Sequence, residues 1–267
     1  MYMNRLELRD KLITLNPKKR IKGFKDSNIR INNNENDDFK YSKTKISNIC
    51  NNIHKLNLSQ NDINILEKVN KSYQKVSDKI ELDKEDFILK KHENVEFKRV
   101  SDEKKHKYII YRYKFNIYPK IKKVDTYPLC VQIEPTSICN FRCIMCYQAD
   151  KSFSSKSNGF MGNMSFETFK IAIDELENNI EAITFASRGE PTLNQDFKKM
   201  LKYTEGKFLG LKINTNASML NEELIHSILS SSLQTIVFSI DAKDKEQYEK
   251  IRINGKFEKI IKNLELF

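Results

Sequence analysis

The chain has 267 residues, enough to bury a sizeable core and to form one or two domains. It carries a formal net charge of +11, and its longest apolar runs fall far short of the roughly 20 residues that a membrane-spanning helix needs. An odd number of cysteines and an N-terminus without an apolar signal segment argue against a secreted, disulfide-bonded protein, so we expect reduced thiols and a cytoplasmic location.

The first 127 residues are rich in Lys and Asn, and we expect them to form a separate, basic α+β region. Residues 31–40 (INNNENDDFK) have the composition of a flexible connector. Residues 87–100 and 107–119 read as strand-rich and predict a small antiparallel sheet. An apolar stripe before them predicts one amphipathic helix, with Ile65, Leu66, Val69, Tyr73 and Val76 on its buried face.

The positive charge is confined to this first region, since residues 1–130 carry +12 and residues 131–267 carry −1. Lysines interleaved with tyrosines occur on nucleic-acid-binding surfaces, where cations meet phosphates and rings stack on bases. A solvated charged face is the commoner origin of such a composition, so we do not expect a nucleic-acid partner. Acidic lipids, sugar phosphates or a leader peptide are equally compatible with it.

Residues 128–267 alternate between strand and helix patterns and are expected to form a second domain. Four short β-branched or aromatic runs predict strands over 131–134, 182–185, 211–214 and 235–240. Three apolar stripes predict helices, one after Ser165 (Phe166, Phe169, Ile173, Leu176), one after Asn221 (Leu224, Ile225, Ile228, Leu229) and one formed by Phe257, Ile260, Ile261 and Leu264. This alternation predicts an α/β fold with a parallel sheet or a β/α barrel.

Polar or reactive residues follow each of the four predicted strands. In β/α barrels the functional groups lie on the loops at the carboxyl ends of the strands, which share one rim. Here those loops hold a cysteine triplet, SRGEPTLN (187–194), TNAS (215–218), and the pair Ser239 and Asp241. We therefore expect all four segments to meet on one side of the domain.

Cys139, Cys143 and Cys146 have the spacing C-x3-C-x2-C. Three thiolates in one loop can hold three irons of a four-iron four-sulfur cluster and leave the fourth iron open to another ligand. Structural zinc sites and electron-carrying ferredoxins use four protein ligands. The other cysteines, Cys50 and Cys130, and the four histidines lie outside the triplet, although Cys130 could in principle complete such a set. A non-catalytic iron-sulfur or zinc-binding protein, acting as a relic or a partner-binding module, is the alternative interpretation.

The loop CNFRCIMC, preceded by VQIEPTS, resembles the cluster loop of the radical S-adenosylmethionine superfamily, in the branch known as the SPASM or twitch group. The resemblance implies a [4Fe-4S] cluster on Cys139, Cys143 and Cys146. It also implies that S-adenosylmethionine chelates the open iron and is reductively cleaved to a 5′-deoxyadenosyl radical. That radical abstracts a hydrogen atom from a substrate, here an unknown peptide, sugar or other small molecule. A one-electron reductant such as flavodoxin or ferredoxin is the implied partner.

The resemblance also implies the residues that bind the cofactor. Gly189, Glu190 and Pro191 match a glycine-glycine-glutamate-proline motif that receives the methionine amino group, with Arg188 in place of the first glycine. The remaining implied contacts are Asn216 near the nucleoside, Ser239 with Asp241 as a further participant, Arg252 for the methionine carboxylate, and Met145 against the adenine, with Tyr147 beside it. The catalytic residues that contact the substrate are unknown.

The pattern contains about four of the six β/α units of the family's partial barrel. We therefore expect an incomplete barrel, which would leave an open strand edge after the fourth unit. A fragment, a truncated reading frame or one half of a split protein would each give this pattern. In the last case a second chain would supply the missing half of the barrel.

Overall fold

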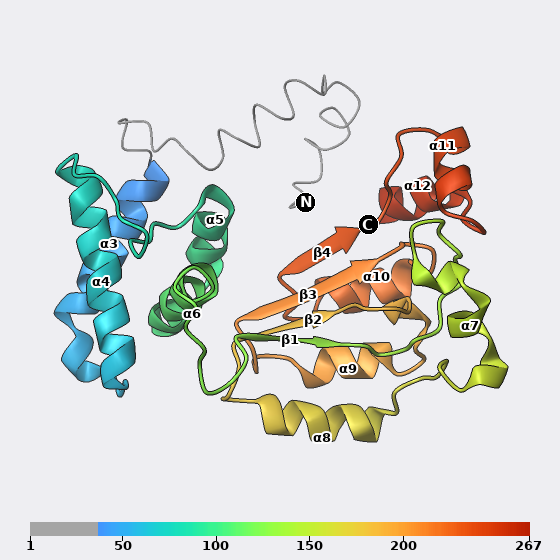
Figure 1. The fold of residues 1–267 in the computed structure, drawn as a ribbon, viewed down its shortest axis with the longest axis horizontal. Helices are drawn as coiled ribbons and strands as arrows, with labels where there is room; N and C mark the ends of the chain where they lie inside the picture. Colours follow the sequence, from blue (N-terminus) through green and yellow to red (C-terminus); the bar gives the residue numbers. More distant parts are fainter. Residues whose placement is uncertain (1–36) are drawn as a thin grey trace. The chain divides into compact units, whose positions relative to one another are not determined.

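The computed structural model describes residues 37–267, which fall into two compact units divided between Leu129 and Cys130 (Figure 1). The first part of the predicted connector, residues 31–36, lies outside the described residues. No helix within the described range is long and apolar enough to cross a membrane.

The described part of the first unit is helical. Its α-helices are α3 (Asp37–Asn51), α4 (Gln60–Ser77), α5 (Lys91–Arg99) and α6 (Lys105–Ile117), joined by the short 3-10 helices η1 (Ile53–Lys55) and η2 (Asp102–Lys104). The amphipathic helix predicted around Ile65 is confirmed as α4, which buries Ile65, Leu66, Val69 and Tyr73. Residues 37–40 of the predicted connector form the first turn of α3 instead of a flexible segment.

The antiparallel sheet predicted for residues 87–100 and 107–119 is wrong, because these segments contain α5 and α6. Their aromatic and β-branched residues suit a strand, but the buried positions recur at helical spacing. Ile109, Tyr113 and Ile117 are four residues apart along α6 and are all buried. Glu93, fully buried on α5, pairs with Arg112 of α6. Tertiary packing therefore outweighs the β propensity of these residues.

The second unit contains a four-stranded parallel sheet in the order β1-β2-β3-β4. Its strands are β1 (Cys130–Ile133), β2 (Ala182–Phe185), β3 (Gly210–Thr215) and β4 (Thr235–Phe238). Each predicted strand is confirmed to within one or two residues at its ends. Because neighbouring strands are parallel and consecutive in the chain, their carboxyl ends lie on the same edge of the sheet. The sheet is not closed, so the architecture is a partial barrel.

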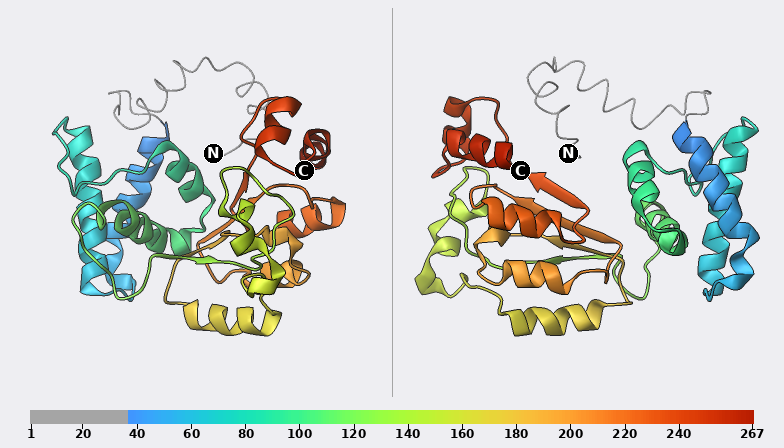
Figure 2. Two further views of the ribbon diagram at one scale, coloured as in Figure 1. Left: turned by 45° about the vertical axis from the view of Figure 1, so that its right-hand side comes forward. Right: turned by 180° about the vertical axis from the view of Figure 1, so that it is seen from behind.

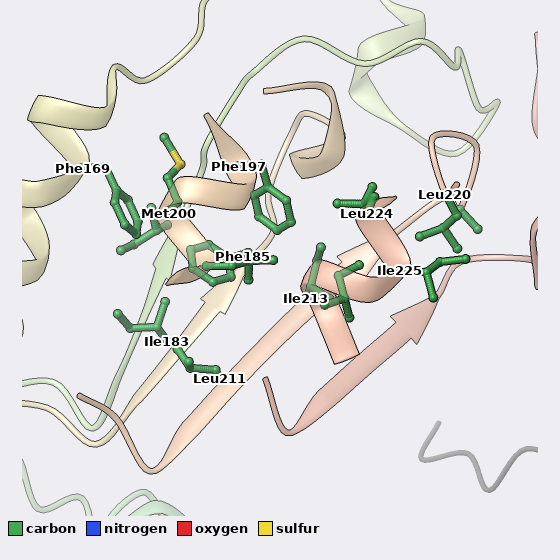
Figure 3. Packing of buried hydrophobic residues seen from close by; sticks show 14 of the residues in the cluster. Phe169, Ile183, Phe185, Phe197, Met200, Leu211, Ile213, Leu220, Leu224 and Ile225 are labelled. Atoms are coloured by element: carbon green, nitrogen blue, oxygen red, sulfur yellow. The ribbon is translucent and has the colours of Figure 1, made fainter. Parts of the chain in front are cut away.

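Helices α8 (Phe166–Leu176), α9 (Phe197–Tyr203) and α10 (Glu222–Leu229) lie along one face of the sheet (Figures 1 and 2). Helices α8 and α10 follow Ser165 and Asn221 as predicted, and each of these two residues caps its helix by accepting a backbone N–H with its side-chain oxygen. The core forms between these layers, where side chains of the two central strands pack against the helices (Figure 3). The labelled members are Phe169, Ile183, Phe185, Phe197, Met200, Leu211, Ile213, Leu220, Leu224 and Ile225.

Three further helices complete the unit. The short helix α7 (Lys151–Ser154) follows the cysteine loop, α11 (Lys245–Ile251) follows β4, and α12 (Phe257–Leu266) is the third predicted helix. Both α7 and α11 lie toward the end of the sheet to which the strand arrows point (Figure 1). The loops after the strands therefore gather at this edge, as the sequence pattern predicts.

Candidate functional site

The cysteine loop leaves its three thiols with different exposure. Cys143 is buried, whereas Cys139 and Cys146 are half-buried, and all are free thiols. The backbone N–H of Phe141 donates to Cys139 Sγ at 3.4 Å, and that of Gln148 donates to Cys146 Sγ at 3.5 Å. Such donors favour thiolates, while burial raises the pKa of the Cys139 thiol. Within residues 37–267 no three His, Cys, Asp or Glu side chains are arranged around one metal ion.

The backbone of the cysteine loop is attached to the segment that ends α11. The N–H of Arg142 donates to the carbonyl of Ile253 at 3.0 Å, and that of Ile144 donates to the carbonyl of Ile251 at 3.0 Å. Both donors flank Cys143 in the sequence. These two bonds fix the position of the middle cysteine relative to the C-terminal end of α11.

Arg252 lies between those two carbonyls and is the C-cap of α11. Its Nη1 donates to Cys143 Sγ at 3.3 Å, and its Nη2 forms an ion pair with Asp241. Its Nε is buried and has no hydrogen-bond partner in the described part of the chain. The predicted site residues Arg252, Asp241 and Cys143 therefore form one contact group.

Glu190 ties the loops after β2 and β3 together. Its carboxylate is 3% exposed, and Oε1 accepts from the N–H of Thr192 at 3.2 Å, the Thr192 hydroxyl at 2.5 Å and the Thr215 hydroxyl at 2.7 Å. Oε2 accepts from the N–H of Asn216 at 2.7 Å. Burial raises the pKa of Glu190, while these hydrogen bonds oppose the rise. The side chain also caps the 3-10 turn η5 (Pro191–Leu193), which Pro191 begins.

The turn before Glu190 packs tightly against the start of the cysteine loop. A Cβ at Gly189 would lie 1.8 Å from the carbonyl oxygen of Thr136, so only glycine fits there. Glu134, at the end of β1, accepts from the N–H of Arg188 at 2.6 Å and from that of Gly189 at 3.3 Å. Its other oxygen pairs with the guanidinium of Arg188 at 3.0 Å. Arg188 is accommodated in this turn through an ion pair.

Asn216 connects the loop after β3 to the cysteine loop. Its amide nitrogen donates to Asn140 Oδ1 at 3.0 Å, and the amide of Asn140 donates to the Ser218 hydroxyl at 2.8 Å. From α12, the buried Asn263 donates to the carbonyl of Ala217 at 2.9 Å. Sequence reasoning missed Asn140, Asn263, Glu134 and Gln148, whose amide donates to the carbonyls of Ser137 and Arg188. The only local signal was that Asn140 directly follows a cysteine of the triplet.

The backbone is unusual in three of the four loops. Ser187, Ala217 and Asp241 follow β2, β3 and β4 respectively, and each has a positive φ, of 131°, 63° and 56°. Residues other than glycine rarely adopt such φ angles, and such backbone strain concentrates at functional sites. The strained positions thus coincide with the predicted rim.

The other predicted residues lie at the periphery. Met145 is 59% exposed and Tyr147 is 45% exposed, and the Tyr147 ring packs edge-on against Phe153. The backbone N–H of Ser239 donates to the carbonyl of Thr215 at 2.9 Å, so Ser239 begins the last of the four loops. Met145 and Ser239 thus lie on or beside the predicted edge, and within the described residues their side chains are held by fewer hydrogen bonds than that of Glu190.

Comparison with known proteins identifies the second unit. The sequence matches the Radical SAM superfamily over residues 133–267. It is 28% identical over 138 residues to the mycofactocin maturase MftC of Mycolicibacterium smegmatis, covering 52% of this chain and 34% of that protein. It is 26% identical over 140 residues to the AdoMet-dependent heme synthase of Methanosarcina barkeri, covering 52% and 39%. The chain therefore spans about a third of the length of these curated relatives.

Among solved structures, Streptococcus suis SuiB shares 18% identity with a TM-score of 0.44, over 79% of this chain and 47% of SuiB. The relatives belong to the SPASM or twitch-like branch that the cysteine loop resembles. The family match extends over half of the sequence and includes all three cysteines of the triplet. The chain belongs to the radical SAM superfamily, whose cofactors are a [4Fe-4S] cluster and S-adenosylmethionine.

Proposed function

We propose that this chain binds a [4Fe-4S] cluster through Cys139, Cys143 and Cys146 and generates a radical from S-adenosylmethionine. The observation that carries the proposal is the attachment of the cysteine loop to the loop that follows β3 and to the end of α11. Asn140 contacts Asn216, and Cys143 contacts Arg252. These contacts link segments more than 70 residues apart in the sequence, and they support the proposal because they join Asn216 and Arg252 to the cysteine loop.

The donor set fits a cluster of this kind. Soft thiolates are the usual ligands of iron-sulfur clusters, and hydrogen bonds to their sulfurs stabilise the charge that they carry. Cys139 and Cys146 each accept a backbone N–H, and Cys143 accepts from the Arg252 guanidinium. Each sulfur thus has a donor from this chain. When bound, the cluster supplies the single electron that cleaves S-adenosylmethionine to methionine and a 5′-deoxyadenosyl radical.

The residues around the thiols are proposed to hold S-adenosylmethionine. Glu190 Oε2 accepts one hydrogen bond in this structure and retains a lone pair for the methionine amino group. Gly189 lets the backbone of this turn lie against the cysteine loop, and Pro191 fixes the direction of the chain after Glu190. The remaining proposed contacts are Asn216 and Ser239 for the nucleoside, Met145 for the adenine, and Arg252 for the methionine carboxylate.

The substrate is proposed to be an organic molecule that gives up a hydrogen atom. A peptide, a sugar or another small molecule all fit this chemistry, and the curated relatives include a maturase and a heme synthase. The electron would come from a small carrier such as flavodoxin or ferredoxin. Because the cluster needs reduced cysteines, the proposal places the protein in the cytoplasm.

The test is anaerobic reconstitution with iron and sulfide, followed by iron analysis and electron paramagnetic resonance. We expect about four irons per chain and a reduced-cluster signal that changes when S-adenosylmethionine is added. Cys143→Ala should abolish the signal. Cys130→Ala is the matched control, since this exposed thiol lies on β1 outside the triplet, and it should keep the cluster.

Two results would contradict the proposal. Zinc retained in place of iron would favour the zinc-binding alternative. A cluster that forms but whose signal is insensitive to S-adenosylmethionine would favour a non-catalytic iron-sulfur protein.

A further inference from the structure

Tyr248 and Arg252 lie four residues apart at the end of α11 and therefore project from the same side of the helix. The Tyr248 side chain is fully buried, and its hydroxyl has no hydrogen-bond partner among the described residues. Leaving a buried hydroxyl unpaired costs about 1–3 kcal/mol, so such groups usually have a partner. The buried Arg252 Nε is unpaired in the same way.

The Arg252 side chain contacts the middle cysteine directly. Arg252 Nη1 lies 3.3 Å from Cys143 Sγ. Burial raises the pKa of the Tyr248 phenol to about 12. The backbone hydrogen bond from Ile144 to Ile251 holds the loop in this register. The end of α11 thus holds a cation beside one sulfur and, one turn earlier, a buried O–H donor that has no partner among the described residues.

We propose that Tyr248 and Arg252 donate to the cluster sulfur region at Cys143 and raise the reduction potential of the cluster. This inference rests on the proposed function, because it requires that Cys143 holds a cluster. Reduction adds one electron, supplied by the carrier protein, and so increases the negative charge. A nearby guanidinium and a hydrogen-bond donor stabilise the reduced state more than the oxidised state.

This role is separable from binding the methionine carboxylate. A carboxylate contact by Arg252 would change the affinity for S-adenosylmethionine, whereas a donor to the cluster acts when S-adenosylmethionine is absent. The Asp241 ion pair also occupies Nη2, which leaves Nη1 on the sulfur. Measuring the potential without S-adenosylmethionine therefore isolates the proposed effect.

The experiment is a redox titration of the reconstituted chain with dithionite and mediators, followed by electron paramagnetic resonance. Arg252→Gln should make the cluster about tenfold harder to reduce, which for a one-electron couple is ~59 mV. Tyr248→Phe removes only the hydroxyl and should shift the potential in the same direction by less. Arg252→Lys keeps the charge and should remain nearest to the unmodified chain.

Two matched controls remove the same groups elsewhere in this unit. Lys250→Gln removes a cation that pairs with Glu246 at the surface of α11. Tyr203→Phe removes a hydroxyl on α9 that donates to Asp174 of α8. Neither should alter the potential. Iron content and circular dichroism of every variant establish that the cluster and the fold are retained.

Unchanged potentials in Arg252→Gln and Tyr248→Phe, with normal iron content, would overturn the inference and leave the proposed function intact. If Arg252→Gln loses its iron, the reduction potentials of Tyr248→Phe and Arg252→Lys decide the question. A lower potential in Tyr248→Phe, with Arg252→Lys close to the unmodified chain, supports the inference, and an unchanged potential in Tyr248→Phe overturns it. Failure of the unmodified chain to bind a cluster would overturn both the inference and the proposed function.

Discussion

Around Glu190, a buried carboxylate satisfies donors from two loops, whereas around Arg252 a buried guanidinium nitrogen has no partner within the described residues. Both groups are charged, and both join loops at the same edge of the sheet. At the Glu190 end, four donors meet one acceptor group and need nothing from outside the chain. At the Arg252 end, Tyr248 is also unpaired, so donors exceed acceptors.

This difference indicates that the two ends of the rim have different roles. The Glu190 end is held in place by the chain itself and so can present the turn at Gly189 in one position. The Arg252 end gains partners only if an acceptor is bound, and unpaired buried donors are costly without one. Stability measurements on the chain without cofactors should therefore be most sensitive at the Glu190 end.

The largest effect is expected from Glu190→Ala. It leaves the buried N–H groups of Thr192 and Asn216 without an acceptor, at about 1–3 kcal/mol each, so the unfolding free energy should fall by about 2–6 kcal/mol. Because the chain contains no tryptophan, a urea titration followed by circular dichroism is suitable. Glu205→Ala, at an exposed position, is the control. Equal urea midpoints for Glu190→Ala and Glu205→Ala would contradict the conclusion that the chain itself stabilises the Glu190 end.

Gly189→Ala tests the close approach behind Glu190. The new Cβ would lie 1.8 Å from the carbonyl oxygen of Thr136. Because this oxygen belongs to the backbone, the clash can be relieved only by a shift of the turn. Overpacking of this kind costs about 1–3 kcal/mol. Gly162→Ala is the matched control, since nothing lies within 4 Å of its Cβ position. The same urea titration should separate the two alanines, and similar midpoints would contradict the described geometry.

Asn263→Ala tests the support that α12 gives to the loop after β3. The buried amide donates to the carbonyls of Ala217 and Ser218, and its loss should cost about 1–2 kcal/mol. Hydrogen exchange of the segment 215–220 should accelerate, while that of β2 should not. Lys262→Ala, on the adjacent exposed position, should leave both unchanged. Faster exchange in β2 as well would indicate general destabilisation of the sheet.

Local patterns in the sequence predicted the strands and the shared rim on which Glu190 meets the loop after β3. They worked there because short β-branched or aromatic runs define the strands, and parallel strands place their carboxyl ends together. Asn140 and Asn263 were missed because their partners lie 46 to 78 residues away, and no periodicity marks such contacts. The helix α6 was mispredicted because its tyrosines and isoleucines favour strands when read one by one.

The smallest effect is expected from Arg188→Gly, which restores the common form of the motif. The guanidinium of Arg188 is partly exposed, and an ion pair of this kind contributes at most about 1 kcal/mol. The backbone N–H groups of Arg188 and Gly189 keep Glu134 as their acceptor in this variant. Glu134→Ala, by contrast, removes that acceptor and should lower the urea midpoint further. If Arg188→Gly proved the more damaging of the two, the side-chain ion pair would hold the turn, and this end of the rim would depend on a surface contact after all.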